Sequence, residues 1–344
     1  MKENYIGRLI VGTEIEDYFM VKAIGVRMGS NNKAYLDVTL GDRTGEASCK
    51  KWAVSPNEEA KLSAIKEGDI VKVRGEVKDW NGNKQMIIST IRPTNPEDLI
   101  DMKDFVKSAP ENPEDMYDFI LKEAESIEDQ DLKRVAITLL TRNKSKLMYY
   151  PAAAKNHHAE FGGLLWHMKR MLMAGLSLCK VYDFLDIDLV VTGVIVHDME
   201  KLNEIEAGEL GMASGYSKKG QLLGHIVQGV DMLGNLGREM EIPEEKILVL
   251  QHMVLSHHYE ADFGSPKKPM FPEAEILHYL DIMDARMYDM EEALRGVQPG
   301  TFSERVRTLD GRKLYRPEFC DELESQEEVL TPEIAGFTDE KEWT

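Results

Sequence analysis

The first 95 residues contain short runs in which apolar and polar positions alternate, as they do in half-buried β-strands. Residues 35–40 alternate in this way, a glycine-bounded turn follows at 41–45, and residues 46–52 lead away from it. Two further runs, 70–77 and 85–88, flank the dipeptide Asn81-Gly82, which is a strong signal for a hairpin. Several short strands separated by glycine-containing turns predict a small barrel or sandwich.

The pattern becomes helical after residue 113. Four of the thirteen prolines fall between residues 93 and 113, which indicates a linker region. Residues 116–121 and 132–140 then repeat apolar side chains with i, i+3, i+4 spacing. A continuous apolar run at 189–196 predicts a buried helix, and it is far shorter than the roughly 20 residues that a membrane span requires.

The composition is that of a soluble globular protein, with 42% hydrophobic and 30% charged residues. The three cysteines are widely separated and odd in number, which argues against a disulfide framework or a cysteine-based zinc site. The first residues lack the apolar segment of a signal peptide. These features predict a cytoplasmic protein that does not bind membranes, and they leave open whether it forms a homo-oligomer.

Charge is distributed unevenly along the chain. Residues 1–95 carry 15 Lys and Arg against 13 Asp and Glu, whereas the whole chain has 42 against 61 and a net charge of −19. A strongly acidic body repels a polyanion at long range. If nucleic acid is the partner, the N-terminal segment is where we expect it to be held. From Pro317 onward the chain has ten acids and one lysine, which predicts a solvated tail.

All nine histidines fall between residues 157 and 278, and one of them, His197, directly precedes Asp198 at the end of the apolar run. Neutral imidazole is a common ligand of transition metals, and a carboxylate adds the charge that a divalent ion needs. Neighbouring residues on a helix project about 100° apart, so both side chains can approach one metal cluster. Lys201 lies four residues after His197, on the same helical face, where its cation suits a phosphate oxygen. The sequence therefore predicts a metal centre.

The other histidines and nearby aspartates divide into candidate ligands and supporting groups. We expect His252 and His278 to pack in the core or to hold a ligand in place, since ligand imidazoles need hydrogen-bonding partners. His157 and His158 either contact substrate or lie on the surface. The remaining candidates are His167, His225, His257, His258, Asp281 and Asp284.

Several sequence motifs resemble those of known protein families. "GGLLWH" at 162–167, "GHI" at 224–226, "LSHH" at 255–258 and "EAEILHYLDIMDA" at 273–285 resemble, in order, the motifs of the HD superfamily of metal-dependent phosphohydrolases. The resemblance covers about residues 155–290. Residues 36–52 resemble the hairpin of the oligonucleotide-binding (OB) fold. Together, the two segments make the chain similar to YhaM-type 3′→5′ exoribonucleases of Gram-positive bacteria.

The resemblance implies the roles of individual residues in the metal centre. It makes Asp281 a direct ligand, Asp284 an orienting group, and Asp198 both a catalytic residue and the bridge between two ions. Paired ions about 3.5–4 Å apart activate a water and stabilise the leaving oxygen of a phosphodiester, while Lys201 would hold the phosphate. The family usually has glycine where this chain has Glu200. The implied ligands of the first ion are His167, His197, Asp198 and Asp281; those of the second are His225, His257 and His258.

The OB resemblance also implies a surface for single-stranded nucleic acid, on which aromatic rings stack with bases and cations meet phosphates. Trp52 belongs either to this surface or to the barrel core, whereas Trp80, beside the predicted turn, is expected to be exposed. The candidate residues of the surface are Tyr35, Lys50, Trp52, Lys72, Arg74, Trp80 and Lys84.

The expected architecture is an OB-fold barrel at 1–95, a linker with leading helices at 96–150, an all-α HD domain at 151–316 and an acidic tail at 317–344. The expected function is a metal-dependent 3′→5′ exoribonuclease that degrades single-stranded RNA to nucleoside 5′-monophosphates. The resemblance favours Mn²⁺, as one or two ions, and single-stranded DNA is a further expected substrate because the chemistry does not need the ribose 2′-OH. The alternatives are an HD phosphohydrolase of small nucleotides with a regulatory OB domain, and a non-catalytic nucleic-acid-binding adaptor.

Overall fold

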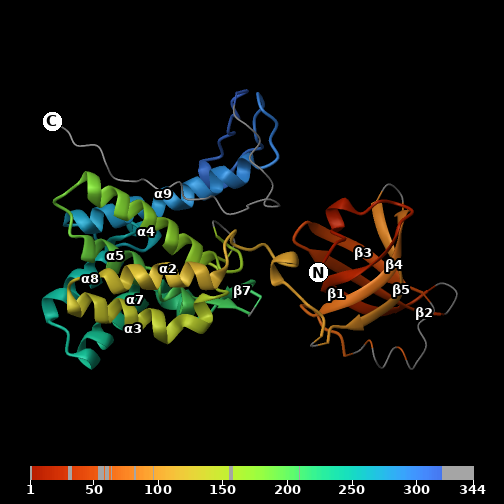
Figure 1. Cartoon of the computed structure of the whole chain (residues 1–344), viewed down its shortest axis with the longest axis horizontal. Coiled ribbons are helices and arrows are strands. Elements are labelled where there is room, and N and C mark those ends of the chain that lie inside the picture. The colour runs from red at the N-terminus through yellow and green to blue at the C-terminus, as the bar shows by residue number, and fades with distance from the viewer. Residues whose placement is uncertain are drawn as a thin grey trace, which may run out of the picture. The chain divides into compact units, whose positions relative to one another are not determined.

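The computed structural model describes residues 2–29, 33–52, 58, 62, 64–80, 83–95, 97–154, 158–208 and 210–319. The predicted Asn81-Gly82 turn, His157 and the tail beyond residue 319 lie outside these described residues. The chain forms two compact units, residues 1–108 and 109–344. One is built from strands and the other mainly from helices (Figure 1).

The first unit is a closed barrel with the strand order β1-β2-β3-β5-β4. Neighbouring strands are antiparallel except β3 and β5, which are parallel. This five-stranded barrel confirms the OB-type fold that the sequence predicted. Its strands are β1 (Glu14–Met28), β2 (Ala34–Asp42), β3 (Gly45–Lys51), β4 (Ile70–Trp80) and β5 (Asn83–Pro93), and the short helix η1 (Ile6–Arg8) precedes them.

Strand β1 is the element that the sequence pattern did not reveal. It pairs with β4 through its first half and with β2 through its second half, so it closes the barrel. A register shift between Val21 and Ala23 interrupts the pairing with β2, and such a bulge bends a strand. The interior of the barrel is filled by fully buried apolar side chains, among them Phe19, Leu36 and Val71.

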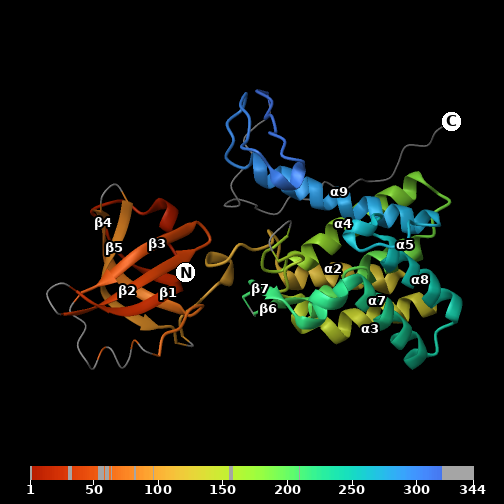
Figure 2. The same cartoon turned by 180° about the vertical axis from the view of Figure 1, so that it is seen from behind.

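The second unit is a helical bundle with a small two-stranded sheet (Figure 2). Asn112, Asp129 and Ser217 cap the N-termini of three of its helices with their side chains. No helix within the described ranges is long and apolar enough to cross a membrane. Its elements, after η2 (Met102–Asp104) of the first unit, are α2 (Pro113–Ser126), α3 (Gln130–Leu147), α4 (Gly163–Val181), α5 (Ile187–Val196), α6 (Lys201–Glu204), β6 (Ile205–Ala207), β7 (Ala213–Tyr216), α7 (Lys218–Met240), α8 (Glu244–Ser256), η3 (Ala261–Phe263), α9 (Pro272–Leu294) and η4 (Arg307–Leu309).

Helix α5 lies at the centre of this bundle. It packs against α3, α4, α8 and α9, and Val194, Ile195 and Val196 have no exposed surface. The helix ends at Val196, so His197 caps it and Asp198 lies in the turn before α6. The expectation that both residues lie within a helix is therefore wrong by a few residues. The end of a buried helix nevertheless delivers both side chains into the interior.

Candidate metal centre

Histidine and aspartate side chains from five helices meet in the interior of the helical unit. His167 comes from the first turn of α4, and His197 and Asp198 follow α5. His225 lies in α7, and Asp281 lies on α9. His257 and His258 follow the last residue of α8. The structure thus brings together all seven residues that the sequence proposed as ligands.

Asp198 occupies the middle of this group, with its two oxygens facing different histidines. Its Oδ2 lies 3.2 Å from Nε2 of His197 and 3.8 Å from Nε2 of His167. Its Oδ1 lies 3.4 Å from Nε2 of His225 and 3.8 Å from Nε2 of His257. The carboxylate therefore separates the cluster into two halves that share one residue.

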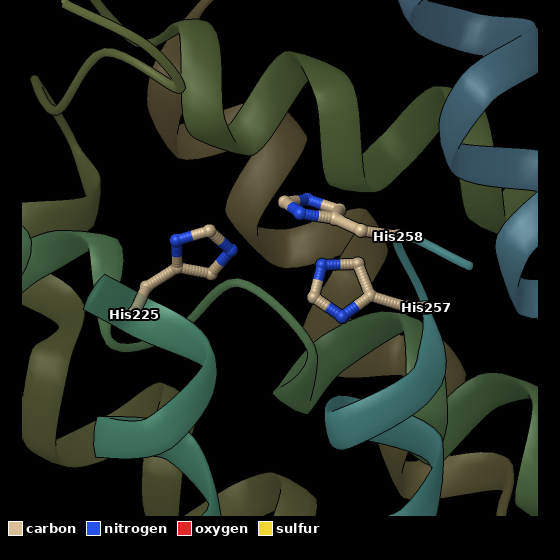
Figure 3. A group of neighbouring side chains, drawn as sticks. All are labelled: His225, His257 and His258. Carbon is tan, nitrogen blue, oxygen red and sulfur yellow. The ribbon is translucent and has the colours of Figure 1, made fainter. Parts of the chain in front are cut away.

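Each half has a set of ligand atoms that lie within 4.8 Å of one another. One set is His167, His197 and Asp198; the other is His225, His257 and His258 (Figure 3). Asp281 stands beside both, because its Oδ1 is 3.3 Å from Nε2 of His167 and its Oδ2 is 3.9 Å from Nε2 of His258.

The rings of the cluster are held with Nδ1 outward and Nε2 inward. The Nδ1 atoms of His197, His257 and His258 donate to the carbonyl oxygens of Val194 at 2.8 Å, Val254 at 2.7 Å and Phe263 at 2.7 Å. A carbonyl can only accept, so Nδ1 carries the proton in these rings and the neutral Nε2 offers a lone pair to the cluster. Hydrogen bonding of this kind fixes the tautomer and orientation of metal-binding histidines.

Carboxylates fix the other two rings. Nδ1 of His167 lies 2.7 Å from Oδ2 of Asp284, and Nδ1 of His225 lies 2.9 Å from Oε2 of Glu204. Glu204 also accepts the backbone N–H of His225 at 3.0 Å. Glu204 was not among the predicted site residues, since no spacing in the sequence relates a residue at the end of α6 to one in α7.

Gly224 explains how His225 reaches the cluster. Its φ of 67° and ψ of 167° interrupt the helical backbone of α7 just before the histidine, and a positive φ favours glycine. The change of direction brings the backbone N–H of His225 to Glu204. Glycine at position 224 therefore permits the backbone geometry that places His225 in the cluster.

Lys201, the first residue of α6, lies beside Asp198. Its Nζ is 2.6 Å from Oδ2 of Asp198, three residues earlier in the chain. Burial acts to lower the pKa of Lys201, but the charges of Asp198 and Asp281 outweigh it and raise that pKa. Glu200, in place of the usual glycine, has φ −78° and ψ −1° and accepts a hydrogen bond from Asn203. Because this backbone is helical, the position does not require glycine.

The ionisation of the cluster suits a cation. Burial acts to raise the pKa of Asp198, but His197 and Lys201 outweigh it and hold that pKa well below its usual value. Burial, with the charges of His258 and His197, lowers the pKa of His257 and keeps this ring neutral. Burial also acts to lower the pKa of His167, but its bonds to Asp281 and Asp284 raise it to about 9.

The donor set fits a divalent transition metal. Within the described part of the chain, the buried Nε2 atoms of His197, His225 and His257 have no hydrogen-bond partner of acceptable geometry. A buried polar atom without a partner is costly. Imidazole nitrogens mixed with carboxylate oxygens are the ligands of manganese, iron, cobalt or nickel. The convergence of such atoms on one interior point is therefore what a metal site requires.

The three described histidines outside the cluster, His158, His252 and His278, have defined partners. His158 is fully buried, which excludes the surface position, and its Nε2 lies 2.8 Å from Oδ2 of Asp284. Nε2 of His252 accepts the backbone N–H of Met270 at 3.0 Å. Nδ1 of His278 donates to the carbonyl oxygen of His257 at 2.7 Å. His252 and His278 therefore bond to the backbone of other segments, and His278 bonds to the backbone of the proposed ligand His257.

Three of the candidate nucleic-acid residues of the barrel, Tyr35, Lys50 and Trp52, form an aromatic and basic group. The rings of Tyr35 and Trp52 lie 4.9 Å apart between centroids, and Nζ of Lys50 lies 5.5 Å and 5.7 Å from them. Trp52 is 52% exposed, so it does not belong to the core. Trp80, at the end of β4, is 64% exposed, and Lys84 is exposed near the start of β5.

Lys72 and Arg74 differ from Lys50 in having acidic partners. Nζ of Lys72 lies 2.8 Å from Oε1 of Glu16, and Nε of Arg74 lies 2.9 Å from Oε1 of Glu14. Each pair joins β4 to β1. A phosphate would compete with these carboxylates, so both cations are less available than Lys50.

Two family models match successive parts of the chain. One is described as "OB-fold nucleic acid binding domain" and matches residues 20–94, and the other is described as "HD domain" and matches residues 164–286. They correspond to the barrel and to the helices that carry the cluster. An HD domain implies a divalent metal, and the histidine and aspartate groups described above provide ligands for one.

Curated relatives extend over both units. A protein named 3′-5′ exoribonuclease YhaM from Shouchella clausii is 40% identical over 309 residues, which cover 90% of this chain and 95% of the relative. A protein of the same name from Bacillus velezensis is 37% identical over 309 residues, covering 90% and 96%. Among solved structures, the second OB-fold domain of replication protein A from Methanococcus maripaludis aligns with 29% of this chain and 100% of its own, at 19% identity. Its TM-score of 0.22 is too low to support an argument.

Proposed function

The chain belongs to the family of 3′-5′ exoribonucleases named YhaM, and on that premise we propose that it degrades single-stranded RNA from the 3′ end to nucleoside 5′-monophosphates. The observation that carries the proposal is the position of Asp198 between two sets of inward-facing imidazoles. In this assignment, residues 1–95 hold the strand and residues 151–316 cleave it.

Metal ions are assigned to the two halves of the cluster. When bound, such ions supply a nucleophilic water near neutral pH and neutralise charge on a phosphodiester. Asp198 would serve both halves with one oxygen each. We propose Mn²⁺, one of the metals that this mixed imidazole and carboxylate donor set suits, because the family resemblance favours it. The proposed ligands are His167, His197, Asp198 and Asp281 for one ion and Asp198, His225, His257 and His258 for the other.

Lys201 is assigned to the substrate phosphate. Its ammonium is buried and held beside Asp198, and burial strengthens its attraction for an anion. The outcome of the reaction follows from which bond breaks. A water oxygen bonds to phosphorus, the bond from phosphorus to the 3′ oxygen of the preceding nucleotide breaks, and that oxygen takes a proton. The released nucleotide then keeps its 5′-phosphate.

The barrel is assigned to strand binding. Tyr35 and Trp52 supply stacking faces, and Lys50 supplies charge beside them. Trp80 and Lys84 offer an exposed ring and cation near the junction of β4 and β5. The proposed hydrolysis does not require the ribose 2′-OH, so we include single-stranded DNA as a further substrate of the same site.

A time course on 5′-labelled single-stranded RNA with added Mn²⁺ tests the function. We expect a ladder that shortens from the 3′ end and releases nucleoside 5′-monophosphates. The ladder should vanish with a chelator and with Asp198→Ala. It should persist with Asp183→Ala, which removes an exposed carboxylate that is not one of the proposed ligands. Internal cleavage, or intact RNA with each metal tried, would contradict the proposal.

A further inference from the structure

The segment that follows α9 forms a folded hairpin, residues 297–316, which we call the basic hairpin. Its two sides are joined by bridges between Phe302 and Tyr315 and between Val306 and Arg312. The backbone N–H of Ser303 donates to the carbonyl oxygen of Leu314 at 2.8 Å. In Figure 1 it is the deep blue loop beyond the end of α9. These bonds give its surface a defined shape.

The basic hairpin is anchored to the preceding helix. Nη2 of Arg286 in α9 lies 3.0 Å from Oδ2 of Asp310. Nη1 of Arg316 donates to the carbonyl oxygen of Val297 at 2.7 Å, and Leu309 is fully buried. The hairpin therefore has a fixed base, from which its other side chains extend.

Its charge is opposite to that of the chain as a whole. Residues 297–316 contain five basic and two acidic side chains, whereas the net charge of the whole protein is −19. Arg305, Arg307 and Lys313 are exposed. Within the described ranges none of these three has a salt bridge. Uncompensated cations on an acidic protein form a local attraction for an anion.

Two large aromatic rings lie beside these cations without being buried. Phe302 is 62% exposed and Tyr315 is 45% exposed. Their centroids lie 5.0 Å apart with a tilt of 46°. A hollow of about 400 Å³ opens between the hairpin and α9, and its walls include Arg305 and Arg307 together with the acidic residues Asp289, Glu292 and Glu304. Exposed rings beside free cations have the chemistry of a stacking platform for a single strand.

We infer that the basic hairpin is a second binding site for single-stranded nucleic acid, located on the catalytic unit itself. Phe302 and Tyr315 would stack with bases, and Arg305, Arg307 and Lys313 would meet phosphates. The inference rests on the proposed function, because degradation of single-stranded RNA supplies the strand that this site would bind. No family model matches these residues, since the HD match ends at residue 286.

The helix α9 sets the length of strand that the hairpin can serve. Asp281 of the cluster and the last helical residue, Leu294, are separated by 13 positions, which is about 20 Å at 1.5 Å per residue. A stacked strand advances about 3.4 Å per nucleotide, so the hairpin lies about six nucleotides from the cluster. Strands of fewer than about six nucleotides would contact the cluster without reaching the hairpin.

Steady-state hydrolysis of two substrates tests the inference with the full chain and Mn²⁺. For a 20-nucleotide RNA, the double variants Phe302→Ala/Tyr315→Ala and Arg305→Gln/Arg307→Gln should raise KM about tenfold and leave kcat within twofold. For a trinucleotide, kcat/KM should stay within twofold of wild type. The control Lys122→Gln/Lys180→Gln removes two exposed lysines of the helical unit that, among the described residues, have no salt bridge. It should behave as wild type on both substrates.

Fluorescence anisotropy of a labelled 20-nucleotide RNA gives a second readout that does not need hydrolysis. Arg305→Gln/Arg307→Gln removes two phosphate contacts and should make the slope of log affinity against log salt concentration shallower by about 1.4. Phe302→Ala/Tyr315→Ala removes only the rings and should leave that slope unchanged. The variant Phe302→Leu/Tyr315→Leu keeps apolar bulk but removes the aromatic rings. If it loses as much RNA affinity as Phe302→Ala/Tyr315→Ala, the contribution of the rings is stacking. Lys313→Gln extends the test, because among the described residues this side chain has no hydrogen bond and no salt bridge.

The outcomes separate this inference from the proposed function. If wild type fails to hydrolyse RNA, the proposed function is wrong, and anisotropy still reports on the hairpin. If wild type is active and every hairpin variant matches the control on the long RNA, the inference is overturned. It is also overturned if the variants lose as much activity on the trinucleotide as on the long RNA, since the hairpin would then support the fold.

Discussion

Nδ1 of His167 lies 2.7 Å from Oδ2 of Asp284. The same carboxylate oxygen is 2.8 Å from Nε2 of His158, and Nε of Arg170 lies 2.6 Å from Oδ1. Asp284 thus holds the ring whose Nε2 faces Asp281 and Asp198. Groups that orient a ligand in this way contribute to metal affinity without touching the metal.

Replacement of Asp284 by asparagine should weaken Mn²⁺ binding about 10- to 100-fold. Excess metal should restore most of the activity, because every proposed ligand remains. The measurement is a metal titration by calorimetry, followed by RNA hydrolysis at low and high Mn²⁺. Asp289→Asn, one and a half turns further along α9, is the matched control. Activity that stays lost at saturating metal would show that Asp284 does more than position His167.

Lys201→Ala should reduce kcat/KM on RNA about 100-fold while leaving Mn²⁺ affinity at or above that of wild type. The reason is that Lys201 repels a cation and attracts a phosphate, and its Nζ lies 2.6 Å from Asp198. Metal titration and single-turnover hydrolysis separate the two effects. A large fall in metal affinity would place Lys201 in the support of the metal site and remove its proposed contact with substrate.

Metal affinity should increase as the pH rises from about 7 to 9 and then level off. Without metal, the pKa of His167 is raised to about 9, so the ring carries a proton at neutral pH that metal binding must displace. The same shift stabilises the metal-free fold fully below the ordinary pKa of 6.5, and this contribution is lost as the pH rises through 9. Calorimetry in buffers of different ionisation enthalpy measures the released proton. An affinity that is independent of pH would refute this coupling.

Trp52→Ala should weaken the binding of single-stranded RNA about tenfold without changing its salt dependence, because one stacking face is lost. Lys50→Gln should reduce the salt slope by about 0.7. Lys72→Gln is the matched comparison and should have less effect, since Glu16 already pairs with Lys72. Anisotropy titrations from 50 to 200 mM salt measure each of these. Equal slopes for the Lys50 and Lys72 variants would contradict the assigned surface.

Much of the architecture and of the cluster could be predicted from the sequence. Strand-like runs and turn signals identified β2 to β5. Helical periodicity identified α2 and α3, and a continuous apolar run identified α5. The resemblance of the motifs brought together His167, His197 and Asp281, which are far apart in the chain. Periodicity reports only local structure. The placement of these three residues in one site therefore depended on motif similarity and not on their spacing.

Other features depend on tertiary contacts that the sequence pattern does not encode. Strand β1 was missed because its buried and exposed positions alternate only in its first part. For His158 the sequence left open a substrate contact or a surface position, yet the side chain is buried beside Asp284 and the ring of Tyr288, 4.1 Å away. The basic hairpin was merged with the end of the helical domain, because its cations and rings come together only when Phe302 and Tyr315 pair.

The bridging position of Asp198 is tested most directly by anomalous diffraction from crystals of the full chain grown with Mn²⁺. Two peaks are expected, one on the side of Asp198 that faces His167 and the other on the side that faces His225. Each should lie in contact with one oxygen of that carboxylate. Manganese bound elsewhere, or within the cluster without contact to Asp198, would contradict the two-ion centre.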